Sequence, residues 1–290
     1  MIVLEIILNG IVLGGMYALI GLGLNFQFGI ARIINIAYGE VLMVAAFCAF
    51  FLYTLFEINP FLGLLIILPV SFVINWLFYR GVLVFLVRRA KGVQDILEKD
   101  SILATFGLIF LIQGVVTLVW GTDFRKYLYL TDGVPIFDTI FPLNRLIACA
   151  VAIAIGLITY LLLKFTRSGT ALRAVAVDPT AAQITGINVQ KYNALAFALG
   201  GVLIATAGVL ISMYLSFEPS IGMVYTMKAL IVVILGGLGH MLGCLVAGII
   251  LGVAESLGAY FVDPGLTLAI NYALFILILL IRPKGLFGVN

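Results

Sequence analysis

Charged residues and histidine are scarce in this chain, and apolar residues are in large excess. Only 10% of its 290 residues are Asp, Glu, Lys or Arg, one is histidine, and 64% are A, V, I, L, M, F, W, Y or C. A soluble domain is about 25% charged, so this composition excludes a water-soluble fold. A helix that spans a bilayer needs about 20 apolar residues, so the length allows about ten spans and no sizeable soluble domain.

Several motifs of enzymes and soluble binding proteins are also absent. The three cysteines, Cys48, Cys149 and Cys244, lie in apolar runs without Cys-x-x-Cys spacing, which argues against a disulfide framework and a metal site. There is no G-x-x-x-x-G-K-[ST] phosphate loop and no nucleophile–base set, so we expect neither an enzyme nor a bound cofactor. The net charge of +3 is small and its cations cluster in a few loops, which argues against nucleic acid as a partner. Residues 1–8 lack the basic region of a cleavable signal peptide, so we expect the first helix to remain in the mature protein.

Polar, proline and charged clusters divide the chain into apolar segments of helical length. The sequence therefore predicts an all-α, polytopic membrane protein, with about nine spans in a single transmembrane domain over residues 1–290. The predicted spans are 5–29, 39–56, 61–82, 101–120, 145–164, 192–214, 224–239, 241–261 and 265–281. We expect the third to continue as a helix through Arg80 to Arg89. The short seventh segment is consistent with a tilted or half helix.

The positions of Lys and Arg predict the orientation, because cationic loops are retained on the cytoplasmic side. The cations that mark inside segments are Arg32, Arg80, Arg88, Arg89, Lys91, Lys99, Lys164, Arg167, Arg173, Lys191, Arg282 and Lys284. Loops 121–144 and 215–223 have no excess of cations and fall on the extracytoplasmic side. All nine segments then alternate, with the N-terminus outside, loop 165–191 inside and the C-terminus in the cytoplasm.

Glycines recur at a spacing of four residues, which places small residues on one helix face and lets backbones approach closely. The pairs are Gly10 and Gly14, Gly239 and Gly243, and Gly248 and Gly252. We expect these faces to pack against other helices. The run from 236 to 243 also reads as a tight turn on the inside, where glycine tolerates positive φ.

The stretch from Gly21 to Glu40 carries polar residues between two apolar runs. Two interpretations stay open with equal weight: a discontinuous helix that lines a substrate site, and a cytoplasmic turn between two spans. Within or beside the membrane, the candidates for a translocation path are Asn35, Glu40, Lys228 and Glu255. Lys228 could instead extend to the outer surface, and Glu40 could lie at the inner interface. We expect Asn9, Asn75, Gln113, Asn193 and Asn271 to serve as interhelical hydrogen-bond partners, and His240 to be structural.

The inside loop from Phe165 to Lys191 is longer than a connection requires. Asp178 followed by Pro179 is a helix start, and Gly186 supplies a stop after about two turns. The sequence therefore predicts a short cytoplasmic helix at 179–185, preceded by another at 169–177 that contains Arg173. The small residues Ala181 and Ala182 would let a partner protein approach this hairpin closely.

Five stretches of sequence resemble one family. T-A-A-Q-I-T-G at 180–186 is similar to the E-A-A-x-x-x-G cytoplasmic motif of ABC importer permeases. The longer run R-S-G-T-A-L-R-A-V-A-V-D-P-T-A-A-Q-I-T-G-I-N at 167–188 resembles the permeases of branched-chain amino acid importers. So do I-N-I-A-Y-G-E at 34–40, P-S-I-G-M-V-Y-T-M-K-A-L at 219–230, L-G-G-L-G at 235–239, and the tail R-P-K-G-L-F-G. The resemblance extends over nearly the whole chain.

The resemblance implies a multi-pass protein in the inner or plasma membrane of a prokaryote. It also implies four kinds of partner: the lipid bilayer, a second related permease subunit, separate ATPase subunits and an extracytoplasmic solute-binding protein. The residues expected to couple to the ATPase are Arg173, Asp178, Pro179, Ala181, Ala182 and Gly186. The sequence departs from the family pattern at Thr180, where the motif has Glu, at His240–Leu242, and in lacking the downstream I-x-L-P.

The function expected from this resemblance is that of a permease that transports branched-chain amino acids, with ATP hydrolysed by another chain. The alternatives are a permease of the same family for urea or short amides, and an ion-coupled secondary transporter. The second alternative would normally show clustered carboxylates or a relay histidine, and it leaves the ordered inside loop unexplained. In the expected mechanism, the helix at 179–185 continues into the sixth span, so its ATP-driven displacement tilts the membrane helices.

Overall fold

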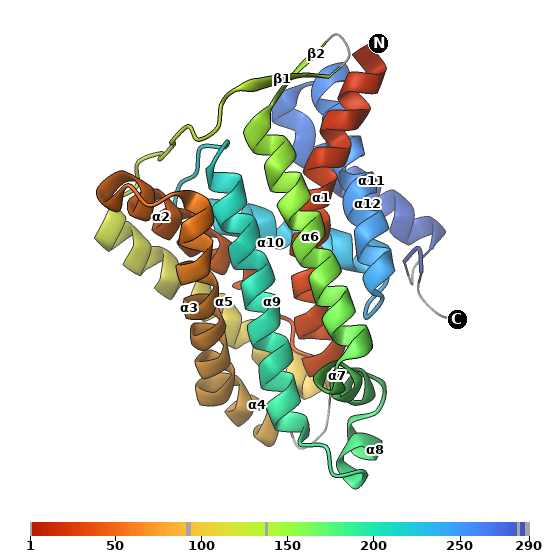
Figure 1. Cartoon of the computed structure of the whole chain (residues 1–290). Helices are drawn as coiled ribbons and strands as arrows, with labels where there is room; N and C mark the ends of the chain where they lie inside the picture. Colours follow the sequence, from red (N-terminus) through yellow and green to blue (C-terminus); the bar gives the residue numbers. More distant parts are fainter. Residues whose placement is uncertain (1, 91–93, 137–138, 283–284, 288–290) are drawn as a thin grey trace.

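The computed structural model describes residues 2–90, 94–136, 139–282 and 285–287, which form a helical protein with one β-hairpin (Figure 1). Its elements are α1 (Ile2–Ala31), α2 (Tyr38–Phe56), α3 (Pro60–Phe78), a π-helical turn (Tyr79–Leu83), α4 (Val84–Arg89), α5 (Gln94–Trp120), β1 (Gly133–Ile136), β2 (Thr139–Pro142), α6 (Leu143–Phe165), α7 (Arg167–Val177), α8 (Pro179–Ile184), α9 (Val189–Ser212), α10 (Ile221–Gly236), α11 (Met241–Phe261), a 3-10 turn (Pro264–Leu266) and α12 (Thr267–Ile281). Lys91 and Lys284, two of the cations used to predict orientation, lie outside the described residues.

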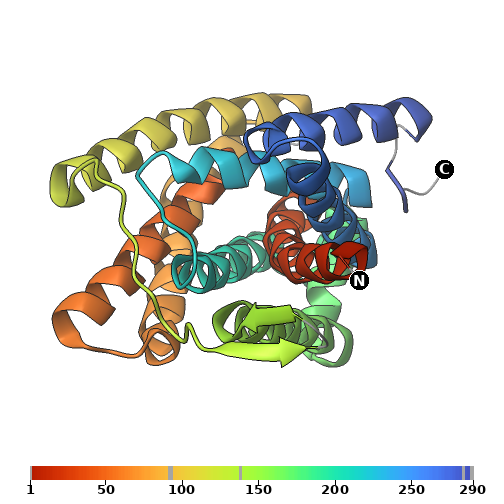
Figure 2. The same cartoon turned by 90° about the horizontal axis from the view of Figure 1, so that it is seen from above.

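The prediction of an all-α polytopic membrane protein is confirmed. Each of the nine predicted segments contains a helix, and eight helices among the described residues are long and apolar enough to cross a membrane. The remaining segment forms α10, which has only 16 residues. Figure 2 shows α10 running across the view at a steep angle to α1. The number of complete crossings and their direction stay predictions.

The third span shows how local sequence sets helix limits. Asn59 caps α3, because its side chain accepts a hydrogen bond from the Phe61 amide at 2.9 Å, and Pro60 occupies the first helical position. The helix then continues through the π-helical turn and α4 to Arg89, as the sequence predicted. A π-helical turn adds a residue to one helical turn without ending the helix.

The two ends of the molecule differ. The N-terminus and the β-hairpin lie at one end, and α7 and α8 lie at the other (Figure 1). The strands pair antiparallel, with Gly133 opposite Pro142, inside the loop predicted to be extracytoplasmic. Arg125 and Phe217 exchange two backbone hydrogen bonds of 2.9 and 3.0 Å, so the two predicted outer loops touch each other. This arrangement agrees with the predicted alternation of spans.

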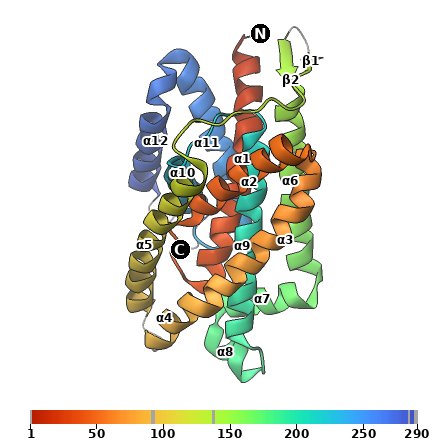
Figure 3. The ribbon, with the colours of Figure 1, turned by 90° about the vertical axis from the view of Figure 1, so that its left-hand side faces the viewer.

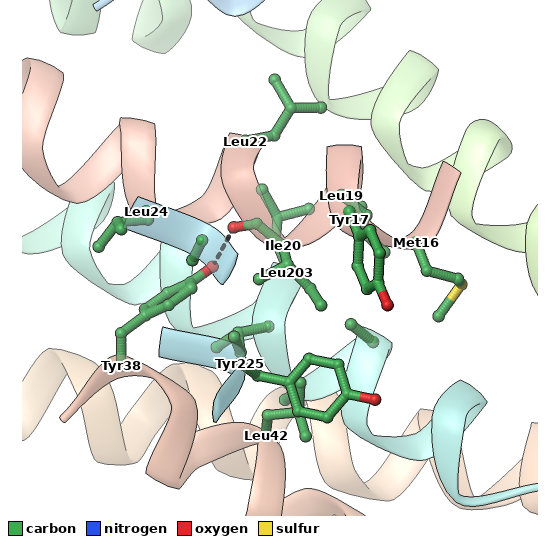
Figure 4. Close-up of a cluster of buried hydrophobic side chains, with 14 of the residues drawn as sticks. Met16, Tyr17, Leu19, Ile20, Leu22, Leu24, Tyr38, Leu42, Leu203 and Tyr225 are labelled. Carbon is green, nitrogen blue, oxygen red and sulfur yellow. Dashed lines mark hydrogen bonds between the residues drawn. The ribbon is translucent and has the colours of Figure 1, made fainter. Parts of the chain in front are cut away.

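The core is centred on α9, most of which is buried against α1, α2 and α3. Figure 4 shows side chains from several helices meeting there, with Tyr38 directed toward α1. The largest interface joins α1 and α11. A Cβ atom on Gly252 would lie 2.3 Å from the Gly14 amide nitrogen, and one on Gly248 would lie 2.4 Å from that of Ala18. These distances place backbone against backbone, which is how small residues bring helices together in lipid.

One glycine pair differs from the expectation. Gly239 lies in the turn between α10 and α11 with φ +84°, so it does not share a helix face with Gly243. Gly243 packs against the carbonyl of Gly236 at the end of α10, whereas Gly239 packs against Gly29 of α1. The turn needs a left-handed backbone at this point, and that requirement, rather than helix packing, accounts for glycine at position 239.

Candidate functional site

The polar stretch between α1 and α2 forms an irregular segment, residues 32–37, which is largely buried. Arg32, with φ +57°, ends α1, and the chain then turns back into the fold. The hydroxyl of Tyr38 donates to the carbonyl of Ile20 at 3.0 Å, and the carbonyl of Gly200 lies 3.4 Å away. Because Ile20 lies about three turns before the end of α1, α2 begins deep inside the bundle. The stretch thus combines features of both interpretations: α1 is continuous to Ala31, Arg32 donates to the Ala176 carbonyl of α7 at 3.2 Å, and the chain then turns back into the bundle.

Side chains satisfy backbone groups of this segment. The amide of Ile36 donates to the Thr105 hydroxyl at 3.2 Å, and that of Gly39 donates to the Thr226 hydroxyl at 2.8 Å. Irregular backbone at membrane depth requires partners of this kind. Asn35 donates to Gln27 Oε1 at 2.9 Å, while its own Oδ1 is buried without a hydrogen-bond partner.

Glu40 lies at the point where two helices begin. It occupies the first turn of α2, and its carboxylate packs against Gly222 in the first turn of α10. The side chain is completely buried. Oε1 accepts from Gln113 Nε2 at 3.0 Å, and Oε2 has no partner among the residues that the structure describes. Helix N-termini carry partial positive charge, so both helices favour an anion here.

Glu40 also borders the apolar cavity between α2, α3 and α5. The cavity measures about 490 Å³, and Val44, Ile67 and Ile112 contribute to its walls, with Ser71 and Asn75 as polar groups. Sites for small molecules are of this size and combine apolar walls with a few polar groups. Asn75 bonds to Ser71 of its own helix, and Ser71 donates to the Gly201 carbonyl at 3.0 Å. The interhelical contact expected of Asn75 is therefore made by Ser71.

Lys228 and Glu255 form a second polar cluster, separate from Glu40. Lys228 Nζ lies 2.9 and 3.0 Å from the two carboxylate oxygens of Glu255, and 2.7 Å from the Tyr17 hydroxyl. Tyr17 donates to Glu255 Oε1 at 3.1 Å, and Asn271 donates to Oε2 at 2.9 Å. The four residues connect α1, α10, α11 and α12. Lys228 is buried in this pair and does not extend to the outer surface.

The candidate path residues thus fall into two groups. Asn35 lies within the irregular segment and Glu40 follows it in the first turn of α2, and each has a buried oxygen without a hydrogen-bond partner among the described residues. Lys228 and Glu255 satisfy each other. Sequence reasoning missed Tyr17, Thr105 and Thr226, which complete these clusters. The only sequence signal for each of them is that it is a polar residue within an otherwise apolar helix.

The hairpin predicted to be cytoplasmic consists of α7 and α8, with bounds close to those predicted. Asp178 accepts hydrogen bonds from the amides of Thr180 and Ala181, at 2.8 and 3.0 Å, and Pro179 occupies the first helical position. Gly186 has φ +83° and follows α8. Asn188 then caps α9 by accepting from the Lys191 amide at 3.0 Å. The short helix and the sixth span are therefore two helices joined at a left-handed glycine.

The hairpin presents apolar side chains outward. Val177 is 85% exposed and Ile184 is 83% exposed, and Arg173 and Ala181 are also exposed. Ala182 differs from the expectation, since it is 4% exposed and packs into the chain's own core. Its small exposed part lines the groove between α7 and α8. The residues that line this groove are Thr170, Arg173, Ala174, Val177, Asp178, Ala181, Ala182 and Thr185.

The turn between α10 and α11 is tied to α1. Asn25 Oδ1 accepts from the Gly239 amide at 2.8 Å. His240 Nδ1 accepts from the Gly243 amide at 3.1 Å, which caps α11, and its ring stacks on Phe287. The single histidine therefore has a structural position. Among the residues described, no three His, Cys, Asp or Glu side chains are grouped so as to hold a metal ion.

The chain is similar to known permeases over nearly its whole length. The family model for the branched-chain amino acid transport system permease component matches residues 6–279. The high-affinity branched-chain amino acid transport system permease proteins LivH of Salmonella typhimurium and BraD of Pseudomonas aeruginosa are each 30% identical to it, over 98% of this chain and 95% of the relative. The ribose import permease protein RbsC of Haemophilus influenzae is 27% identical over 81% of this chain and 71% of the relative. No solved structure gives a significant match.

Proposed function

The chain belongs to the permease family of branched-chain amino acid transport systems, and from this premise we propose that it forms part of the path of an ATP-driven importer for branched-chain amino acids. The names of LivH and BraD support this substrate class over urea and short amides. The family match likewise gives no support to an ion-coupled secondary transporter.

The importer would contain a second related permease, ATPase subunits and an extracytoplasmic binding protein. The binding protein would dock on loops 121–144 and 215–223, whose contact at Arg125 and Phe217 supports a single docking surface. The ATPase would hold the α7–α8 hairpin at the opposite end (Figure 1). The observation that carries this proposal is the outward apolar surface of the hairpin, with Val177 and Ile184 almost fully exposed. Exposed apolar side chains that gather on one surface mark an interaction site.

Gly186 would transmit the movement of α8 to α9. The amide of Ile187 donates to the Ala182 carbonyl at 3.0 Å, so the two helices are joined through one closed turn. Any other residue at position 186 would have to adopt φ near +83°, which costs about 1–2 kcal/mol for a residue with a Cβ. A substitution that displaces this turn would change how a movement of α8 is transmitted to α9 and the other membrane helices.

The proposed path runs past Asn35 and Glu40. Asn35 lies in the irregular segment and Glu40 in the first turn of α2, and breaks between helices inside a bundle are where transporters bind solute. Oε2 of Glu40, which has no partner among the described residues, would accept a hydrogen bond from the substrate ammonium group, and the apolar wall of the adjoining cavity would receive the substrate side chain. Lys228 would not bind the substrate carboxylate, because Glu255 already neutralises it.

The test is Gly186→Leu in the complete importer, reconstituted with its binding protein. We expect the complex to assemble and hydrolyse ATP, but ATP-driven uptake should fall at least tenfold. The matched control is Gly81→Leu, because Gly81 is exposed, has no neighbour within 4 Å of an added Cβ, and has no positive φ. Unchanged uptake and unchanged stimulation of ATPase activity in the assembled Gly186→Leu complex would refute the coupling role.

A further inference from the structure

A cavity of about 320 Å³ lies beside α7 and is separate from the proposed path. It is bounded by the ends of α1 and α6, by α7, and by the turn between α10 and α11. Among its lining residues are Asn25, Phe26, Tyr160, Leu163, Lys164 and Arg173. One wall is therefore apolar, and the other carries hydrogen-bond donors and two cations.

The cavity has a strongly one-sided charge. Lys164 and Arg173 are exposed, and no Asp or Glu lines the cavity. Neither cation forms an ion pair with a carboxylate of the described residues. Asn25 uses Oδ1 for the Gly239 amide, and its Nδ2 is a further donor. These groups fit an anion with several acceptor oxygens, such as a phosphate group.

The position of the cavity fits the level of lipid headgroups. Lys164 is in the last turn of α6, whose exposed face above it is apolar and includes Leu157 and Leu161. In Figure 3, α7 lies across the lower end of α6, as a helix at the boundary between membrane and water would. Lys164 Nζ lies 5.7 and 5.5 Å from the ring centres of Tyr160 and Phe165, an aromatic and cationic pairing typical of this level.

We propose that this cavity binds the phosphate headgroup of an anionic lipid, with Lys164 and Arg173 holding the phosphate and the acyl chains lying along the exposed face of α6. Basic pockets between helices on the cytoplasmic side suit such headgroups. The apolar wall and the adjoining lipid-facing helix favour a lipid over free phosphate. They also favour it over an acidic segment of a soluble protein, which would have no use for an apolar wall inside the bilayer.

Arg173 connects this cavity to the hairpin that is proposed to couple to the ATPase. It lines this cavity and also the groove between α7 and α8. A bound lipid would fix Arg173 and so α7, on which α8 rests. This consequence depends on the proposed role of the hairpin, whereas lipid binding itself does not.

The experiment uses the purified full chain in detergent, without its ATPase, and follows its thermal unfolding midpoint during titration. The probes are phosphatidylglycerol, phosphatidylcholine with the same acyl chains, and inorganic phosphate. A ligand that binds the folded state raises the midpoint in a saturable way. We expect this for phosphatidylglycerol alone, with a half-saturating concentration at least tenfold higher in Lys164→Gln/Arg173→Gln. The matched control is Arg167→Gln, an exposed cation of α7 that lines neither the cavity nor the groove, and it should respond as the natural chain does.

Four outcomes would overturn the proposal. An equal response to phosphatidylcholine would remove the role of charge, and an equal response to inorganic phosphate would make this a free-phosphate site. An equal loss in Arg167→Gln would show diffuse attraction to a basic surface. If none of the three probes changes the unfolding midpoint of the natural chain, the cavity binds neither lipid headgroup nor phosphate. A fold defect in the double variant is recognised from its midpoint without lipid, and Lys164→Arg/Arg173→Lys, which keeps both charges, should then retain the response.

Discussion

Two acidic side chains of the described helices, the buried Glu40 and the largely buried Glu255, differ in their hydrogen-bond partners. Each oxygen of Glu255 accepts from two partners, supplied by Lys228, Tyr17 and Asn271. Glu40 has one partner, Gln113, and one oxygen with none. A buried charge is expensive unless it is paired and hydrogen-bonded, so the first arrangement holds helices in place. The arrangement at Glu40 leaves one carboxylate oxygen free beside a cavity, where it could accept a hydrogen bond from the substrate.

The largest expected effect comes from breaking the complete cluster. Lys228→Met leaves the Glu255 carboxylate buried and unpaired, and we expect it to lower the free energy of unfolding by about 3–5 kcal/mol. Lys228→Met/Glu255→Gln removes both charges and should recover most of this loss, because a neutral pair of similar volume is often tolerated. Denaturant unfolding of the purified chain in detergent measures both. Equal destabilisation by the single and double variants would show that the charges do not act as a pair.

A smaller effect is expected at the hydroxyl that joins these charges. Tyr17→Phe removes the acceptor of the Lys228 bond and the donor to Glu255, and should cost about 1–3 kcal/mol of unfolding free energy. The same substitution in the Lys228→Met/Glu255→Gln background should cost much less, since the charged partners are gone. The difference between the two costs, from the same unfolding experiment, is the coupling energy. If the two costs agree, the hydroxyl acts independently of the ion pair.

The sequence predicted the helices more completely than the contacts between them. Apolar length located all nine segments, and the Asp178–Pro179 start and Gly186 stop located α8 to within one residue, because both signals are local. The pairing of Lys228 with Glu255 was not predicted, since the two lie 2.9 Å apart only after α10 and α11 fold back on each other. The burial of Ala182 also depends on tertiary packing, which helical spacing alone does not determine. The interpretation of segment 32–37 could not be decided from the sequence for the same reason, because its polar residues fit a turn in water as well as a buried break between helices.

The smallest effect on stability, and the sharpest test of the comparison, is expected at Glu40. Glu40→Gln keeps an oxygen for the Gln113 bond and removes the charge, so the free energy of unfolding should change by less than about 1 kcal/mol. ATP-driven uptake by the assembled importer should nevertheless fall at least tenfold, because the substrate ammonium group loses its charged acceptor. The matched control is Glu57→Gln at the exposed end of the same helix, which should leave stability and uptake as they are. If the Glu40→Gln importer transports normally, Glu40 has a structural role, as Glu255 has, and does not belong to the translocation path.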